Sequence, residues 1–170
     1  KFCMKHNMKL IIPQKSDPKE SPINYKGEVD FFKDNLSTDE FKYYNEHVLK
    51  NTRFTYSSYR VVLNSKVTVG AMSTLLREKL GSGGKMLSCN LTKKRMYDFP
   101  IEGICRINDC TYDEFEKRLL EIYHMSKEEY FSKINRNVDY ISKVDKNYST
   151  IDLIRIKLNE MGCKKSVNLS

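Results

Sequence analysis

The fold is decided by residues 66–90, which read Lys66-Val67-Thr68-Val69-Gly70-Ala71-Met72-Ser73-Thr74-Leu75-Leu76-Arg77-Glu78-Lys79-Leu80-Gly81-Ser82-Gly83-Gly84-Lys85-Met86-Leu87-Ser88-Cys89-Asn90. The β-branched residues at 66–69 predict a strand. Ser73 and Thr74 predict the start of a helix that ends at the glycines of residues 81–84, and a second strand follows at 86–89. Parallel strands joined by a helix form a β-α-β unit, so the sequence predicts an α/β protein.

The segments before this unit add further elements. Leu10-Ile11-Ile12, followed by Pro13, predicts a buried strand that ends in a loop. The turn formers Asp17-Pro18 and Ser21-Pro22 predict that residues 16–24 form a loop or insertion. A capping box over residues 37–40 predicts a helix to about Leu49, and residues 57–63 show a second helical pattern.

The segments after residue 90 complete the predicted fold. A loop that contains residues 97–100 precedes a candidate strand at 104–107. Three helices are expected after the capping residues Thr111, Ser126 and Ser149, and Gly162 is placed to end the last one. The second of these helices is predicted from an apolar stripe formed by Tyr130, Ile134, Val138 and Ile141. We therefore expect a Rossmann-like parallel sheet flanked by helices, in one domain over residues 1–170 with a terminal helical segment at 141–170.

Composition and charge narrow the possible functions. The chain has 170 residues, 39% hydrophobic and 31% charged, which suits one folded domain, and it has no 18-residue apolar run that could span a bilayer. Thirty Lys and Arg against 22 Asp and Glu give a net charge of +8, which suits phosphorylated ligands, an anionic membrane surface or nucleic acid. Nucleic acid is disfavoured because the densest basic run, Lys93-Lys94-Arg95, has only three members.

The cysteines and histidines indicate no metal site and no catalytic dyad. The five cysteines are an odd number with no CxxC pair, so the sequence predicts neither zinc nor a disulfide framework, and we expect a reducing, cytoplasmic compartment. None of the three histidines belongs to a pattern with a nucleophile, and the catalytic residues stay unassigned. Because the chain opens without Met and without a signal-peptide pattern, we expect it to be a fragment of a longer protein.

The candidate ligand site lies at the turn after the first strand of the β-α-β unit. Ligands of open parallel sheets bind at the carboxyl ends of the strands, where the amino end of a helix can receive a phosphate. Gly70 would allow close approach, Ser73 and Thr74 would contact phosphate, and Glu78, one turn further, could accept both hydroxyls of a ribose. Lys15, after the strand at residues 10–12, is a weaker phosphate candidate. Ordinary helix capping and a solvated surface lysine explain the same residues, and spacing alone does not decide between these readings.

Several of these segments together resemble a known family. They are Ser58-Tyr59-Arg60, residues 65–70, 73–78, 84–87 and 99–103, and the stretch 112–130, which ends in Met125-Ser126-Lys127-Glu128-Glu129-Tyr130. They resemble the carboxyl-terminal half of GT-B glycosyltransferases, especially enzymes that build bacterial capsule or lipopolysaccharide. The resemblance extends from about Leu10 to Tyr140.

The resemblance implies a function and a set of partners. This half of such enzymes binds a nucleotide-diphosphate sugar, and the other half usually carries the site for the glycan or lipid-linked acceptor. It implies phosphate contacts at Ser73 and Thr74, a ribose contact at Glu78, and a cytoplasmic enzyme at the inner face of the membrane. No cofactor or metal is expected, because the sequence has no DxD motif. Many retaining members have a second Glu eight positions before the ribose-binding one, and here that position is Gly70.

Two alternatives remain open from the sequence. One is a non-enzymatic Rossmann-like module whose basic surface binds an anionic partner or membrane. The other is an enzyme related to nucleotide-sugar epimerases, because folds of this class host many chemistries.

Overall fold

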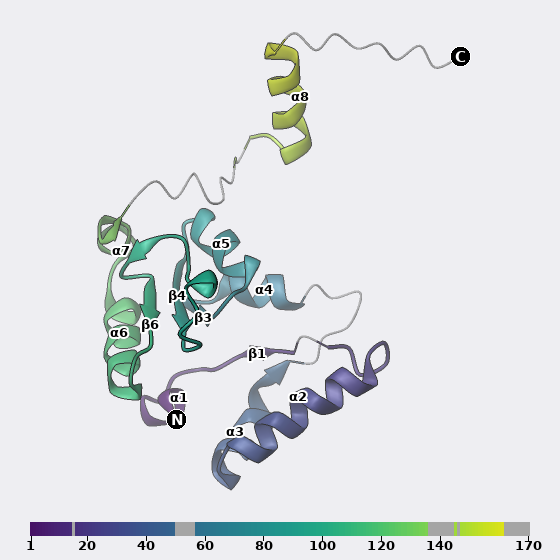
Figure 1. Cartoon of the computed structure of the whole chain (residues 1–170), viewed down its shortest axis with the longest axis vertical. Coiled ribbons are helices and arrows are strands. Elements are labelled where there is room, and N and C mark those ends of the chain that lie inside the picture. Colours follow the sequence, from purple (N-terminus) through teal and green to yellow (C-terminus); the bar gives the residue numbers. More distant parts are fainter. Residues whose placement is uncertain (15, 50–56, 136–144, 146, 162–170) are drawn as a thin grey trace.

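The central element of the fold is a parallel sheet of three strands (Figure 1). A computed structural model describes residues 1–14, 16–49, 57–135, 145 and 147–161. The strands are β3 (Val67–Gly70), β4 (Lys85–Asn90) and β6 (Arg106–Asn108), in the order β3-β4-β6. Gly70 pairs with Ser88, and Ser88 pairs with Arg106. The predicted strand-helix-strand unit is confirmed, and the chain is a mixed α/β protein with short parallel strands flanked by helices.

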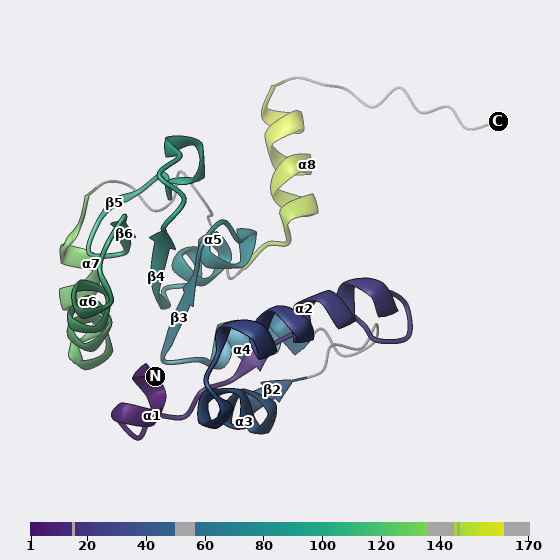
Figure 2. The same cartoon turned by 60° about the horizontal axis from the view of Figure 1, so that its bottom comes forward.

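Helices cover the two faces of this sheet. Helix α5 (Thr74–Gly81) connects β3 to β4 and lies beside α4 (Ser57–Asn64), whereas α6 (Tyr112–His124) and α7 (Lys127–Ser132) lie on the other side of the strands (Figures 1 and 2). The predicted helices at residues 57–63 and 75–80 and those after Thr111 and Ser126 are thereby confirmed, although α7 is short. The buried core between these layers includes Leu76, Leu80, Met86, Leu87, Phe99, Ile101, Ile104, Cys105, Leu119, Ile122, Met125 and Tyr130.

Two buried lysines bind the carboxyl ends of helices, Lys79 from α5 and Lys85 from β4. Lys79 is 3% exposed, and its Nζ donates to the carbonyls of Leu63 and Ser65 at the end of α4. Lys85 is 5% exposed, and its Nζ donates to the Ile122 carbonyl over 2.6 Å and to two further carbonyls at the end of α6. Burial lowers the pKa of both ammonium groups. A cation at the carboxyl end of a helix complements the helix dipole, which offsets this burial.

The amino-terminal part forms a separate, smaller parallel pair. Strand β1 (Ile12–Pro13) pairs with β2 (Val48–Leu49), and α2 (Pro22–Asn35) and α3 (Thr38–His47) connect them. The expectation that the strand ends before Pro13 is wrong, because Pro13 pairs with Leu49 in this two-stranded sheet. Proline is tolerated in such an edge strand. The capping box predicted at residues 37–40 is present, but α3 ends at His47 and the chain then extends into β2.

Helix α2 corrects the prediction of a loop over residues 16–24. Ser21 is the cap residue of this helix and Pro22 is its first residue. Proline fits the first position of a helix because the N–H that it lacks would have no partner inside the helix. The same Ser-Pro pair is typical of turns, which explains the wrong expectation.

The segment after α7 also differs from the prediction. The helical stripe was expected to continue through Ile134, but α7 ends at Ser132, and Ile134 belongs to β7 (Ile134–Asn135). This strand pairs antiparallel with β5 (Glu102–Gly103), within a stretch expected to be a loop. Val138 and Ile141 lie outside the described residues, as does Gly162.

The last described helix, α8 (Thr150–Glu160), begins after Ser149 as predicted. It stands apart from the sheet in both views (Figures 1 and 2). Its apolar residues Ile151 and Ile154 are 62% and 53% exposed. The remaining described elements are the short helices η1 (Arg95–Tyr97) and α1 (Phe2–Lys5).

Candidate functional site

The carboxyl ends of the three parallel strands define the candidate site. Strand β3 ends at Gly70, β4 at Asn90 and β6 at Asn108, and the register of the strands brings these ends to one edge of the sheet. The amino ends of α5 and α6 follow β3 and β6 at the same edge. This is the place where open parallel sheets bind ligands.

The turn between β3 and α5 carries most of the predicted site residues. Ser73 caps α5, and its hydroxyl accepts a hydrogen bond from the Leu75 N–H over 3.2 Å. The fully buried Ser88 hydroxyl donates to the Ala71 carbonyl over 3.1 Å and so fixes the turn to β4. Ser73 and Thr74 are both exposed at the surface. The turn is therefore held in place by its hydrogen bond to β4, while Ser73 and Thr74 remain exposed.

Gly70 and Glu78 flank this turn. A Cβ atom on Gly70 would lie 3.4 Å from the Leu76 Cδ1, which is an ordinary contact, so packing does not require glycine here. Glu78 is half-buried and lies four residues after Thr74, on the same side of α5. Within the described part of the chain, its carboxylate makes no hydrogen bond or ion pair. The structure thus places Ser73, Thr74 and Glu78 along α5 and Gly70 at the end of β3, before the same turn, whereas Lys15 lies outside the described residues.

The residues at and after the end of β4 also shape this edge of the sheet, and the sequence did not predict them. Asn90 is 3% exposed, and its side-chain amide donates to the Asp98 carboxylate over 2.6 Å and to the Lys94 carbonyl over 3.1 Å. Its side-chain oxygen accepts from the N–H and the hydroxyl of Thr92. One buried amide therefore shapes the loop at residues 91–98. The pattern of an Asn at the end of a buried strand, with Thr two residues later, could have indicated this turn.

This loop carries the densest basic run of the chain to the candidate site. Lys93, Lys94 and Arg95 are all exposed, and they follow the carboxyl end of β4, the strand next to β3. Arg77 adds an exposed cation in the second turn of α5. In the sequence this run bears only on nucleic-acid binding, which its short length disfavours, but the fold places it at the same sheet edge as the Ser73 turn.

The two helix amino ends at this edge differ in charge. Helix α6 has Asp113 and Glu114 in its first turn, and Glu114 forms a capping box with Thr111 that satisfies free N–H groups. The hydrogen bonds from Thr111 lower the pKa of the Glu114 carboxyl. Helix α5 has no acidic residue in its first turn. An anion is therefore attracted to the amino end of α5 and repelled from that of α6.

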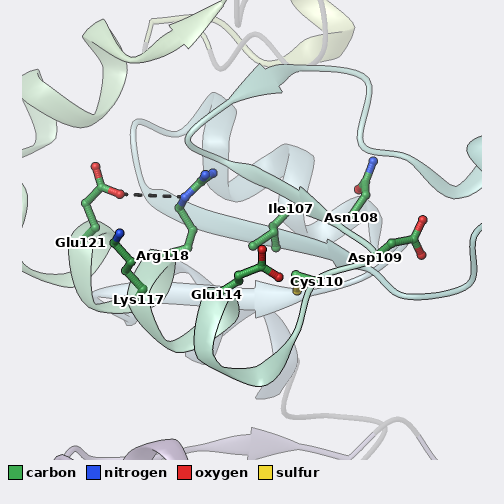
Figure 3. Close-up of a pocket in the computed structure, with 8 residues that line it drawn as sticks. All are labelled: Ile107, Asn108, Asp109, Cys110, Glu114, Lys117, Arg118 and Glu121. Atoms are coloured by element: carbon green, nitrogen blue, oxygen red, sulfur yellow. Dashed lines mark ion pairs between the residues drawn. The ribbon is translucent and has the colours of Figure 1, made fainter.

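A hollow of about 410 Å³ lies elsewhere along the edge, between β6 and α6 (Figure 3). Its lining carries both signs of charge, and Arg118 is held there by the carbonyls of Ile104 and Arg106, each 3.3 Å away. The predicted nucleotide-binding residues are absent from its wall. Its lining residues are Ile107, Asn108, Asp109, Cys110, Glu114, Lys117, Arg118 and Glu121.

No protein-family model, curated protein or solved structure matches the chain. Across the described residues, no group of three or more His, Cys, Asp or Glu side chains is placed to hold a metal ion. Nor is any helix in that part of the chain both long and apolar enough to cross a membrane.

The arrangement at α5 has the chemical groups that a phosphorylated, diol-bearing ligand requires. The Thr74 N–H and the hydroxyls of Ser73 and Thr74 at the start of α5 can bind phosphate oxygens, and nearby lysines and arginines can neutralise their charge. A carboxylate without a partner in the described structure can accept hydrogen bonds from two neighbouring hydroxyls. These groups position and neutralise a ligand, and none of them is an evident acid or base for a chemical step.

Proposed function

We propose that this chain is the donor-binding part of a glycosyltransferase, a Rossmann-like half of the GT-B type that holds a nucleotide-diphosphate sugar. The observation that carries the proposal is the amino end of α5, which lacks acidic residues and lies on the same sheet edge as the basic loop at 93–95. The acceptor would be a surface glycan or a lipid-linked precursor, as the resemblance in sequence suggests.

In this proposal each group has a defined task. The N–H group of Thr74 and the hydroxyls of Ser73 and Thr74 bind the diphosphate. Lys93, Lys94 and Arg95 neutralise its charge, which grows on the leaving diphosphate as the bond to the sugar breaks. Glu78 accepts hydrogen bonds from the ribose hydroxyls. Catalysis then rests on placing the donor and stabilising the leaving group.

Calorimetric titration with UDP, GDP, CDP and CMP tests the binding step. We expect at least one nucleoside diphosphate to bind and CMP, with one phosphate fewer, to bind more weakly. Replacing Lys93, Lys94 and Arg95 with Gln should weaken binding by about tenfold, equivalent to about 1.4 kcal/mol. A matched variant replaces Lys26, Arg155 and Lys157, which are exposed on α2 and α8, and should change affinity less than about twofold. Absence of heat with all four nucleotides at millimolar concentration would overturn the proposal.

Glu78 allows a sharper test of the ribose contact. Glu78→Gln should weaken the binding of the preferred nucleoside diphosphate and leave the binding of inorganic pyrophosphate unchanged, because pyrophosphate has no ribose. Equal weakening of both ligands would show that Glu78 acts on the helix and not on the sugar. Binding to anionic vesicles that is insensitive to changes at Ser73 and Glu78 would instead support the non-enzymatic alternative.

A further inference from the structure

Two cysteine side chains meet between the ends of β4 and β6. Cys89 lies in β4, and Cys110 follows β6 just before the cap residue of α6. Their sulfur atoms are 3.9 Å apart although 21 positions separate them in the chain. Both side chains are half-buried, whereas Cys105 is fully buried and its sulfur faces the Ile101 carbonyl.

The backbone around the two thiols is already held at a short separation. The Asp109 N–H donates to the Asn90 carbonyl over 2.9 Å, so the residues that follow Cys89 and precede Cys110 are bonded to each other. A disulfide has an S–S distance of about 2.05 Å, and the sulfur atoms must therefore approach by about 2 Å. Rotation of the two side chains supplies a movement of this size.

The two thiols differ in their access to solvent. Cys110 lines the hollow between β6 and α6, beside Asp109 and Glu114, so a small molecule can reach it (Figure 3). Cys89 is not among the lining residues of that hollow. Burial, followed by the effect of Cys110, raises the pKa of Cys89 to about 11, which keeps this thiol protonated at neutral pH. An oxidant therefore reaches the Cys110 thiol first, and Cys89 is the partner that does not line the hollow.

We propose that Cys89 and Cys110 form a redox-reactive pair that hydrogen peroxide converts into an intramolecular disulfide. The Cys110 sulfur attacks the O–O bond of the peroxide, forms an S–O bond and releases hydroxide, which leaves as water after it takes the thiol proton. The Cys89 sulfur then displaces the hydroxyl group from Cys110. An S–S bond forms, the S–O bond breaks, and the second water carries away the Cys89 proton. Two thiols are oxidised, and one peroxide is reduced to two waters.

The pair agrees with the reducing compartment that the cysteine pattern suggests. Disulfides in such compartments are mostly transient and redox-sensing rather than structural. The bond would join the end of β4 to the start of α6, next to Asn90, which holds the loop at residues 91–98. The inference rests on the geometry of the two thiols and does not depend on nucleotide binding.

Peptide mapping of the intact chain tests the pair. The reduced protein is treated with hydrogen peroxide, the remaining thiols are alkylated under denaturing conditions, and the product is digested with trypsin. Alkylation should fall from five labels to three. Trypsin places Cys89 on the peptide of residues 86–93, Cys110 on 107–117 and Cys105 on 96–106. A linked peptide of 86–93 with 107–117 is expected, and dithiothreitol should restore both free thiols.

Serine variants provide the controls. Cys89→Ser and Cys110→Ser should each abolish the linked peptide, whereas Cys3→Ser should retain it. If a serine variant does not fold, the map of the unmodified chain still decides the question. Full alkylation of both thiols after peroxide treatment, oxidation of Cys110 to sulfinic or sulfonic acid without a linked peptide, or a link from Cys110 to a different cysteine would each overturn the proposal.

Discussion

The Tyr130 hydroxyl donates a hydrogen bond to the Met86 carbonyl over 2.6 Å and accepts one from the Met86 N–H over 3.1 Å. Strand β6 lies on this side of β4 and pairs with it only from Ser88 to Asn90, and the Ser88 N–H donates to the Cys105 carbonyl. It therefore supplies no backbone partner for Met86. A single side chain from α7 therefore takes the place of the missing strand at Met86. Both residues are fully buried, so water cannot substitute for the hydroxyl.

Tyr130→Phe should destabilise the fold by about 2 kcal/mol, because it keeps the ring but leaves the N–H and carbonyl of Met86 without partners. Urea denaturation followed by circular dichroism measures the change. Tyr112→Phe is the matched control, since Tyr112 is 42% exposed and should change stability by less than about 0.5 kcal/mol. Equal effects of the two substitutions would contradict the role of Tyr130 as a substitute strand partner.

Two glycines of the β-α-β unit should respond differently to alanine. A Cβ atom on Gly84 would lie 2.4 Å from the Lys79 Cε, and this lysine cannot move freely because its ammonium holds the end of α4. Gly84→Ala should therefore cost about 1–3 kcal/mol, typical of overpacking. A Cβ on Gly70 meets Leu76 only at 3.4 Å, so Gly70→Ala should change stability by less than about 1 kcal/mol.

The same pair of variants separates packing from ligand binding. If a phosphate approaches the backbone at Gly70, Gly70→Ala should weaken nucleoside diphosphate binding in calorimetry even though the protein stays folded. Gly84→Ala should lower the melting temperature without a specific effect on affinity in the folded protein. Unchanged affinity in Gly70→Ala would remove Gly70 from the proposed site.

Much of the fold could be predicted from local signals, and the failures have identifiable causes. The unit at residues 66–90 was predictable because β-branched residues, a serine cap and glycines follow one another in order. The helix that starts at Pro22 was missed because a Ser-Pro pair fits both a turn and a helix start. Ile134 continues the spacing from Tyr130, but it pairs with Gly103 in a strand, and such a distant partner has no local signal.

Only part of the candidate site could be predicted from the sequence. The Ser73 turn depends on residues adjacent in sequence, and its capping hydrogen bond to Leu75 follows from the sequence pattern. The position of the basic run at 93–95 depends instead on the buried side chain of Asn90 and on its bond to Asp98. Burial of a polar amide is a property of the folded chain, and it could not be read from the charges alone.

Stability at alkaline pH should depend on Cys105. Burial raises the pKa of this thiol from 9.0 to about 11. The folded protein therefore keeps a proton that the unfolded chain loses above pH 9, so the stabilisation is complete below pH 9 and is lost as the pH rises to about 11. A shift of two pKa units corresponds to about 2–3 kcal/mol.

Cys105→Ala checks this prediction by urea denaturation at several pH values. The variant should be less stable at neutral pH because a buried side chain is shortened, but its stability should fall less steeply between pH 9 and 11. The difference at neutral pH serves as the baseline for the alkaline comparison. Parallel curves for the variant and the unmodified protein would show that another group causes the alkaline loss.

The turn between β3 and α5 should depend on Ser88. Its buried hydroxyl donates to the Ala71 carbonyl, and Ser88→Ala would leave that carbonyl without this donor, at a cost of about 1–2 kcal/mol. Since Ala71 precedes Ser73 and Thr74 in the turn, the variant should also bind nucleoside diphosphates more weakly than the unmodified protein. Ser82→Ala is the control, because the Ser82 hydroxyl also donates to a carbonyl, that of Lys79, but at the opposite end of α5.

Docking of the amino-terminal helix should depend on Glu116. The Lys5 ammonium donates to the Glu116 carboxylate over 2.9 Å, and the His6 Nε2 lies 2.6 Å from its other oxygen. The hydrogen bond from Lys5, followed by that from His6, lowers the pKa of the carboxyl below its ordinary value of 4.5. The contact therefore stabilises α1 fully above pH 4.5 and is lost as the pH falls through the lower pKa of the folded protein.

Glu116→Gln should loosen α1 at neutral pH, because it removes the charge that both partners face. Amide hydrogen exchange measures this directly at the N–H groups of Lys5 and His6, which are bonded to the carbonyls of Lys1 and Phe2. Exchange of these two N–H groups should accelerate in Glu116→Gln. In the unmodified protein, their exchange relative to the intrinsic rate should also accelerate below pH 4.5. Glu121→Gln removes the same charge from the same helix, but Glu121 pairs with Lys133 and Arg118, so exchange in α1 should stay unchanged. Faster exchange in both variants would assign the effect to helix α6 as a whole instead of to the Glu116 contact.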